Sequence, residues 1–163
     1  MEEKAKSYGE ALSKLIQVET VSASNYSGLK KFHAFHAVLK ECFPLLFSVC
    51  EAEDFSGSLM LRWQGSNAKD KPPVMFMNHH DVVEADGIDW LYPPFSGTIA
   101  DGKVCGRGTL DTKVDNAAGG GGADKRGLYA DAGHLFCIHL YGGNNRRERA
   151  FPSADAYRQA HTF

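Results

Sequence analysis

The sequence predicts an α/β domain, a three-layer fold with a mixed sheet that stays incomplete after about residue 113. Three observations predict it. Helical and then strand-like patterns follow one another over residues 1–104. The run "VMFMN" is almost continuously apolar, which is typical of a central strand covered on both faces. Beyond Lys113 no periodicity is sustained, and the 163 residues suit one domain.

Two amphipathic helices are expected first. The apolar residues of one helix, over residues 4–17, recur at helical spacing: Tyr8, Leu12, Leu15 and Ile16. The second helix follows Ser27, a candidate N-cap, and stops at Pro44. Its apolar stripe consists of Phe32, Phe35 and Leu39. It also carries His33 and His36 at i, i+3, which we interpret as surface or core-edge histidines because no carboxylate motif accompanies them.

Strand patterns come next. "SLMLRW" (Ser58–Trp63) predicts one strand, and "VMFMNHHDVV" (Val74–Val83) predicts the central one. Asp101-Gly102 lies between short β runs, which is the signal of a tight hairpin. Farther on, "HLFCIHLY" predicts one more strand inside an otherwise weakly patterned segment.

Composition narrows the possible partners. The net charge of −2 gives no reason to expect a nucleic acid or an anionic membrane. The basic residues Arg146, Arg147 and Arg149 are best explained as a solvated tail. No apolar run approaches the ~20 residues of a membrane span, and the charged start lacks a signal-peptide core. We therefore expect a cytoplasmic location; the oligomeric state stays open.

The motif "NHHDVV" ends the central strand, where open α/β sheets place ligand-binding groups. His79 and Asp81 are two residues apart, so on an extended chain their side chains point the same way. A metal-binding histidine usually donates its other N–H to an acceptor, and Asp81 could supply or orient one. His80 points to the opposite face and is expected to be packed or exposed. Alone, a His-x-Asp pair is more often a surface pair than a metal site.

The second motif is "GRGTLDTK", in which Asp111 follows a turn framed by Gly106 and Gly108. Both glycines can adopt positive φ. A carboxylate has two oxygens and can bridge two cations, as a two-metal hydrolytic site requires. Asp111 could instead, or in addition, be a helix N-cap.

Together these motifs carry a resemblance. The stretch Val74–Lys113 contains H-x-D-V-V and G-R-G-x-x-D-x-K joined by a "W…PPFSG…DG" segment. It resembles the signature region of the zinc-dependent metallopeptidase family that includes aminoacylase, carboxypeptidase S and succinyl-diaminopimelate desuccinylase. The earlier segments "LIQVETVSA" and "FHAFHAVLKECFPLLF" also fit its beginning, nearest to carboxypeptidase S-like members. The resemblance covers residues 1 to about 113.

The resemblance implies a dizinc hydrolase of amide bonds that acts on peptides or N-acyl amino acids. In that reading His79 is a zinc ligand, Asp81 is the catalytic aspartate that orients it, and Asp111 bridges both zinc ions. The resemblance also implies a cis peptide bond at Asp111–Thr112 and a Glu-Glu pair on a later strand, as general base and ligand. This chain has no such pair after Asp111, where its one glutamate is Glu148. Zinc binding is therefore expected to be weak or partial.

A change of reading frame near Val114 would explain the missing pair. Read one nucleotide later, the codons of residues 133–145 permit "DIYFAFTFTEEI", in which Gly142 and Gly143 become glutamates. The same shift turns the glycine tract before residue 123 into codons that include alanine and glutamate, which favour a helix. We therefore expect residues 114–163 to be a frame-shifted or disordered tail.

Three functional interpretations follow. The first is a metallopeptidase or amidohydrolase by family, with the present chain an inactive fragment that lacks the Glu-Glu pair. The second is a non-enzymatic truncated relative that binds a partner or a single metal ion. The third is a partly folded α/β fragment whose uncovered sheet edges promote aggregation.

Overall fold

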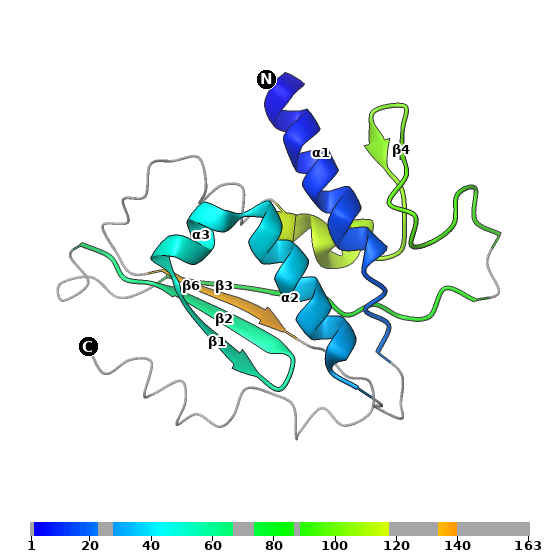
Figure 1. Cartoon of the computed structure of the whole chain (residues 1–163). Coiled ribbons are helices and arrows are strands. Elements are labelled where there is room, and N and C mark those ends of the chain that lie inside the picture. The colour runs from blue at the N-terminus through cyan, green and yellow to red at the C-terminus, as the bar shows by residue number, and fades with distance from the viewer. Residues whose placement is uncertain (1, 23–27, 67–73, 87–88, 118–133, 140–163) are drawn as a thin grey trace.

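The structure is a computed structural model, and it describes residues 2–22, 28–66, 74–86, 89–117 and 134–139. Three helices and a four-stranded sheet form its body, and a small hairpin stands apart from that sheet (Figure 1). The elements in chain order are α1 (Glu2–Gln17), α2 (Lys30–Cys42), α3 (Pro44–Val49), β1 (Glu51–Phe55), β2 (Ser58–Trp63), β3 (Val74–His79), β4 (Ile99–Ala100), β5 (Lys103–Val104), the wide turn η1 (Thr109–Lys113) and β6 (His134–His139).

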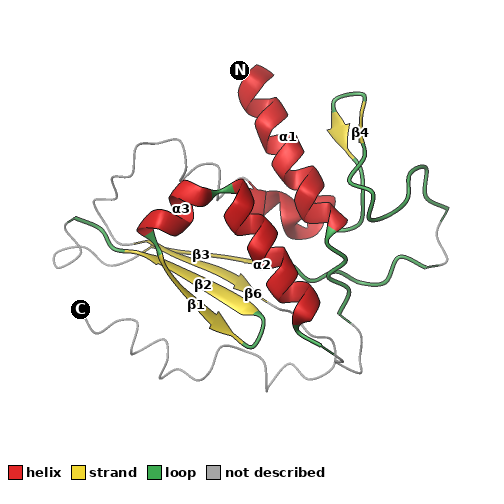
Figure 2. Ribbon diagram, viewed as in Figure 1, coloured by secondary structure: helices red, strands yellow, loops and turns green. Residues whose placement is uncertain are grey.

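The main sheet has the strand order β1-β2-β6-β3. The first two neighbouring pairs are antiparallel, whereas β3 and β6 run parallel, so the predicted mixed sheet is confirmed. The described helices lie on one side of this sheet (Figure 2). The described part of the chain therefore shows two of the three predicted layers.

The hydrophobic core lies between the helices and strand β2. Its best-buried members come from all of these elements: Leu15, Ile16, Phe35, Leu39, Leu46 and Leu61. Side chains spaced three and four apart on α1 and α2 meet alternate side chains of β2, as their two periodicities require. This core fixes the C-terminal end of α1, which later supports the candidate site.

Both predicted helices are confirmed, but the second begins differently. Leu29 occupies the N-cap position of α2 and makes no side-chain capping bond. The expected N-cap, Ser27, lies outside the described residues. Pro44 ends α2 as predicted and also begins α3, because proline is well suited to the first turn of a helix.

The hairpin at Asp101-Gly102 is confirmed, with φ of 50° and 71° at these two residues. Strand β1, in contrast, was not predicted. Four of its five residues are exposed, so it lacks the apolar alternation that identifies a strand. The sequence feature that could have revealed β1 is Ser56-Gly57. Both residues have positive φ and form the turn of the β1–β2 hairpin.

The expectation that both faces of β3 are covered is wrong for the described structure. β3 is an outer strand of the sheet, shorter than expected, and Val74–Met77 are all exposed. That prediction rested on the apolar residues of β3, which show that a strand can be covered on both faces. They do not show that covering elements are present, and the described residues leave Val74–Met77 exposed.

The strand predicted in "HLFCIHLY" is confirmed as β6, which lies between β2 and β3. The sheet therefore includes one strand from beyond residue 113, as that pattern predicted. Most of the remaining segment, residues 118–133 and 140–163, lies outside the described residues. None of the described helices has the length and apolar character needed to cross a membrane.

Candidate functional site

The candidate site begins at the last residue of β3. His79 is about one-third exposed, and its Nδ1 faces Asp81, 3.4 Å from Oδ1 and 3.1 Å from the carbonyl oxygen. The chain has left the strand by Asp81, yet the two side chains still meet as their spacing predicted. Because Nδ1 of His79 contacts Asp81, the other ring nitrogen, Nε2, points outward.

Asp81 is buried and held from a second direction. Ser22 Oγ donates a hydrogen bond of 2.8 Å to Asp81 Oδ2. The backbone of Ser22 also donates to the carbonyl of Val82, whose own N–H donates to the carbonyl of Thr20. The short segment after α1 thus pairs with the segment after β3 and fixes the carboxylate behind His79.

Asp111 approaches His79 from the opposite side. Its side chain is 85% exposed, and its Oδ1 lies 3.0 Å from His79 Nε2. The peptide bond Asp111–Thr112 is cis, as the family resemblance implies. Thr112 Oγ1 donates to the carbonyl of His79 at 2.7 Å, which joins the turn to the end of β3. The structure thus brings the three predicted site residues together.

The glycines of this turn are required by close packing. Gly108 has φ of 78°, and a Cβ there would lie 2.4 Å from Val82 Cγ1. A Cβ on Gly106 would lie 2.5 Å from Ile16 Cγ2. No larger residue fits either position without a shift of its neighbours.

Lys113 anchors the turn, a role that sequence reasoning missed. Its side chain is fully buried, and Nζ donates to the carbonyls of Leu15 (3.1 Å) and Val18 (2.8 Å) at the end of α1. Nζ also lies 5.4 Å from the ring centroid of Phe35. Burial lowers the pKa of Lys113 to about 7. The available signal was the lysine two residues after Asp111 in the second motif.

The two carboxylates set the charge state of His79. Hydrogen bonding to Asp81 is the largest cause that raises the pKa of His79 to about 9, against an opposing effect of burial. Asp111 adds a smaller rise. In the metal-free protein the imidazole is therefore protonated at neutral pH, and a metal ion must displace that proton.

The residues present fit a metal ion in part. An imidazole nitrogen and a carboxylate oxygen are preferred zinc donors, and His79 Nε2 and Asp111 Oδ1 converge from two elements. Among the described residues, no group of three His, Cys, Asp or Glu side chains could hold a metal ion. A catalytic zinc typically has three protein ligands, so the described residues supply only a part of such a set.

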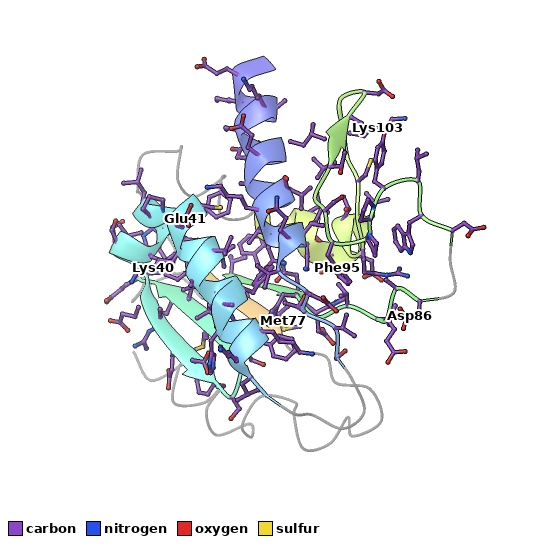
Figure 3. All side chains as sticks on the ribbon, turned by 45° about the vertical axis from the view of Figure 1, so that its right-hand side comes forward. Lys40, Glu41, Met77, Asp86, Phe95 and Lys103 are labelled. Atoms are coloured by element: carbon purple, nitrogen blue, oxygen red, sulfur yellow. The ribbon has the colours of Figure 1, made fainter. Side chains whose placement is uncertain are left out.

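A cavity of about 970 Å³ adjoins these residues. Its walls combine the site with apolar and basic side chains: Leu12, Val82, Val83, Lys103, Val104, Arg107, Leu110 and Val114. Figure 3 labels Lys103 on the hairpin. Two contacts hold the Arg107 side chain in place. Its Cζ lies 5.0 Å from the centroid of the Trp90 ring, and its Nη2 donates a hydrogen bond to the carbonyl of Glu84. The space is large enough for a small organic substrate.

The three other histidines whose side chains the structure describes lie in the core or at its edge, as predicted. His80 is fully buried against the rings of Phe32 and Phe35. His36 Nδ1 lies 3.1 Å from Asp54 Oδ2, and His33 Nε2 lies 3.5 Å from Asp54 Oδ1. These two histidines join α2 to β1 at the edge of the core.

Comparison with known proteins identifies relatives of this chain. It is 38% identical over 119 residues to the N-fatty-acyl-amino acid synthase/hydrolase PM20D1 of Xenopus tropicalis, and 36% identical over 110 residues to the human protein of that name. It is 33% identical over 126 residues to a probable carboxypeptidase S-like protein of Dictyostelium discoideum. Comparison with protein-family models finds no match.

Solved structures show the same fold. Human carnosine dipeptidase 1 matches with a TM-score of 0.61 at 19% identity over 82% of this chain and 31% of its own. An M20 family metallo-carboxypeptidase of Sulfolobus solfataricus matches with a TM-score of 0.56 at 23% identity over 85% of this chain and 30% of its own.

The matches cover most of this chain and a small part of each relative. They span 69%, 71% and 64% of this chain for the frog, slime-mould and human proteins, and 22%, 24% and 21% of those proteins. The chain thus spans less than a quarter of the length of these relatives.

Proposed function

The N-terminal part of this chain is homologous to the M20 family of metallopeptidases, and from that premise we propose that its site is part of a dizinc amide hydrolase centre. The homologues are amide-bond hydrolases: dipeptidases, carboxypeptidases and N-acyl amino acid hydrolases. The substrate class proposed for the intact centre is accordingly a peptide or an N-acyl amino acid.

In this proposal His79 and Asp111 hold zinc, and Asp81 orients His79. When bound, zinc supplies Lewis acidity, which polarises a carbonyl and makes water more acidic. Asp81 acts through its contact with Nδ1, which leaves Nε2 to bind metal. Ser22 holds the second oxygen of Asp81, so the orienting carboxylate is itself positioned.

One observation carries the proposal: His79 Nε2 and Asp111 Oδ1 converge to 3.0 Å although they lie 32 residues apart on different elements. The parallel pairing of β6 with β3 adds support, because His139 is in register with His79. The carboxyl ends of parallel strands meet at one edge of a sheet.

We further propose that the present chain does not catalyse hydrolysis. The sequence lacks a Glu-Glu pair after Asp111, so the general base that the family resemblance implies is missing. The alternative function is a non-enzymatic relative that binds a single metal ion or a partner. The pair formed by His79 and Asp111 favours the metal-binding version of that alternative.

Metal titration tests the proposed ligands. Co²⁺, which reports its coordination by absorption, and Zn²⁺, by competition, should bind one chain weakly. Asp111→Asn and His79→Gln should each abolish that binding, while Asp101→Asn, a change in the exposed hairpin turn, should leave it unchanged. Equal binding by all three variants would contradict the assignment.

Activity assays test the absence of catalysis. The purified chain with added Zn²⁺ is expected to turn over neither dipeptides nor N-acetyl amino acids. Turnover that disappears in Asp111→Asn would overturn this proposal and show that the chain supplies its own base. Turnover that persists in Asp111→Asn would identify a contaminating enzyme.

A further inference from the structure

The proposed metal pair comes from two segments that are far apart in the chain. His79 ends β3 and Asp81 follows it, whereas Asp111 lies in the turn η1. His79 Nε2 and Asp111 Oδ1 lie 3.0 Å apart. A binding site must hold its groups within about 0.5 Å of the geometry that binds. The contacts that tie these two segments together therefore decide how well the pair can share an ion.

The turn meets the first segment at two consecutive residues, Arg107 and Gly108. The missing side chain of Gly108 allows a close approach, because a Cβ there would lie 2.4 Å from Val82 Cγ1. Arg107 Nη2 donates a hydrogen bond of 3.2 Å to the carbonyl of Glu84, two residues farther along the first segment. Gly108 thus permits the approach, and Arg107 holds it.

Arg107 has two further contacts with the loop that follows this segment. Its Cζ lies 5.0 Å from the centroid of the Trp90 ring, and its backbone N–H donates to the carbonyl of Pro94 at 2.7 Å. Trp90 Nε1 in turn donates to the carbonyl of Ala85 at 3.0 Å. The contacts therefore form a closed circuit, from Arg107 to Trp90, from Trp90 to Ala85, and along the backbone to the carbonyl that Arg107 binds.

Arginine is the side chain best suited to this combination of contacts. The guanidinium group is planar, so it can stack on a ring through its face and donate hydrogen bonds from its edge at the same time. A cation over the face of an indole ring is also attracted by the ring electrons. Arg107 and Trp90 are both half-buried, so water screens their contact less than it would at a fully exposed site.

We propose that Arg107 is a positioning residue of the metal pair, which clamps the segment after Asp81 to the turn that carries Asp111. This role rests on the proposed function, in which His79 and Asp111 hold zinc. Arg107 acts through the backbone of Glu84 and through its own place in the turn.

The clamp holds the turn against a part of the chain that is itself fixed. The N–H of Val82 donates to the carbonyl of Thr20, and the carbonyl of Val82 accepts from the N–H of Ser22. Glu84 lies two residues beyond this anchored point. A shift of Arg107 would therefore move the turn relative to the support behind His79.

The position of Arg107 also suggests a different role, since it lines the cavity beside the site. There its charge would bind the carboxylate of a substrate. That role predicts no change in the metal-free chain when Arg107 is replaced. The clamp predicts a change in the separation of the two segments with neither metal nor substrate present.

Electron paramagnetic resonance of the metal-free chain tests the clamp separately from metal binding. Nitroxide labels at Val83 and Leu110, which are 68% and 84% exposed, report the separation of the two segments. Unnatural amino acids carry the labels, because the chain has four native cysteines. Arg107→Met should broaden the distance distribution. Arg62→Met, which removes the ion pair of another arginine with Glu51 on the sheet, is the matched control and should leave it unchanged.

Co²⁺ titration tests the consequence for the site. Arg107→Met and Trp90→Leu should each lower Co²⁺ affinity by about threefold to tenfold, because they act through the backbone and not on a ligand directly. The double variant should lose little more than either single variant, since the two residues form one clamp. Arg62→Met should bind Co²⁺ as the parent chain does. Urea unfolding checks that each variant is folded, and Trp90→Leu serves as the second test of the same clamp.

The two measurements separate the clamp from the proposed function. An unchanged distance distribution in both Arg107→Met and Trp90→Leu would overturn the clamp, whatever the metal affinity. A broadened distribution with unchanged Co²⁺ affinity would also overturn it, and so would an equal loss of affinity in Arg62→Met. If the distribution broadened but the parent chain bound no Co²⁺, the proposed function would fail and the clamp between the two segments would stand.

Discussion

The Asp111 turn and strand β3 supply the two sides of one site, but they are held in different ways. The turn is tied to α1 by the buried ammonium of Lys113 and packs Gly108 against Val82. Strand β3 is paired along one edge by β6, while its side chains from Val74 to Met77 are exposed. One side of the site rests on buried polar contacts, and the other rests on a strand that is outermost in the described part of the sheet.

This difference shows which part of the site the chain can build alone. Buried hydrogen bonds to Lys113 and Asp81 depend on residues of the first helix and of the segment after it, all within the described region. The position of His79 depends also on the pairing of β3 with β6. We therefore expect changes in the turn to have the larger effects on stability.

Lys113→Ala should have the largest effect. It removes a fully buried side chain and leaves the carbonyls of Leu15 and Val18 without their donor. We expect a loss of roughly 3 kcal/mol or more in the free energy of unfolding, measured with urea. The exposed Lys103→Ala is the control and should change little. Equal stability of the two variants would show that Lys113 does not anchor the turn.

The pH dependence of stability should separate Lys113 from His79 in the metal-free chain. Lys113 has a pKa of about 7 when folded and near 10.5 when unfolded, so between these values the unfolded state binds more protons and stability rises with pH. His79 has a pKa of about 9 when folded and near 6.5 when unfolded, so its contribution is complete below 6.5 and is lost as pH rises through 9.

The two effects oppose one another between pH 7 and 9. Above pH 9 Cys50 opposes Lys113, because burial raises the pKa of the Cys50 thiol from 9.0 to about 11. The test is therefore the difference in the free energy of urea unfolding between the parent chain and each variant. The stability of the parent chain relative to Lys113→Met should rise with pH from about 7 to 10.5, and its stability relative to His79→Gln should fall between pH 6.5 and 9. A difference for Lys113→Met that stayed constant with pH would show that Lys113 keeps an ordinary pKa in the folded chain.

The variants Gly108→Ala and Gly102→Ala separate the energetic cost of a packing clash from that of an unfavourable backbone conformation. Both glycines have positive φ, 78° and 71°, but an added Cβ meets Val82 Cγ1 at 2.4 Å in the first and nothing within 4 Å in the second. Gly102→Ala should cost roughly 1 kcal/mol from conformation alone. Gly108→Ala should cost about 1 kcal/mol more, because Val82 must move. Equal losses in the free energy of urea unfolding for the two variants would show that Val82 and the turn can shift at little cost.

Much of this site could be predicted because its signals are local. The spacing of His79 and Asp81, and the glycines before Asp111, are visible in a few residues. The cis bond at Asp111–Thr112 was implied by the family resemblance and is present. The anchoring by Lys113 was not predicted, because its partners are backbone carbonyls 95 and 98 residues away that no sequence pattern marks.

The fold was predicted where apolar periodicity reports a buried face, as in α1, α2 and β2. It was missed at β1, where exposed acids replace the alternation, and at β3, where the apolar run implied a cover that the described residues do not provide. Periodicity reports what a segment can bury, and the elements beside it decide whether that burial occurs.

The smallest predicted effect concerns the support behind the site. Ser22→Ala removes the donor to Asp81 Oδ2 but leaves Asp81 and its contact with His79 in place. Partners that orient a metal-binding histidine typically contribute about tenfold or more to metal affinity, and Ser22 is one contact farther away. We therefore expect Co²⁺ affinity to fall by less than about tenfold in Ser22→Ala and by more in Asp81→Asn. Ser48→Ala, whose hydroxyl bonds Leu45 on α3, should leave affinity unchanged. If Ser22→Ala weakened binding as much as Asp81→Asn, the orientation of the carboxylate, rather than its presence, would control how His79 binds metal.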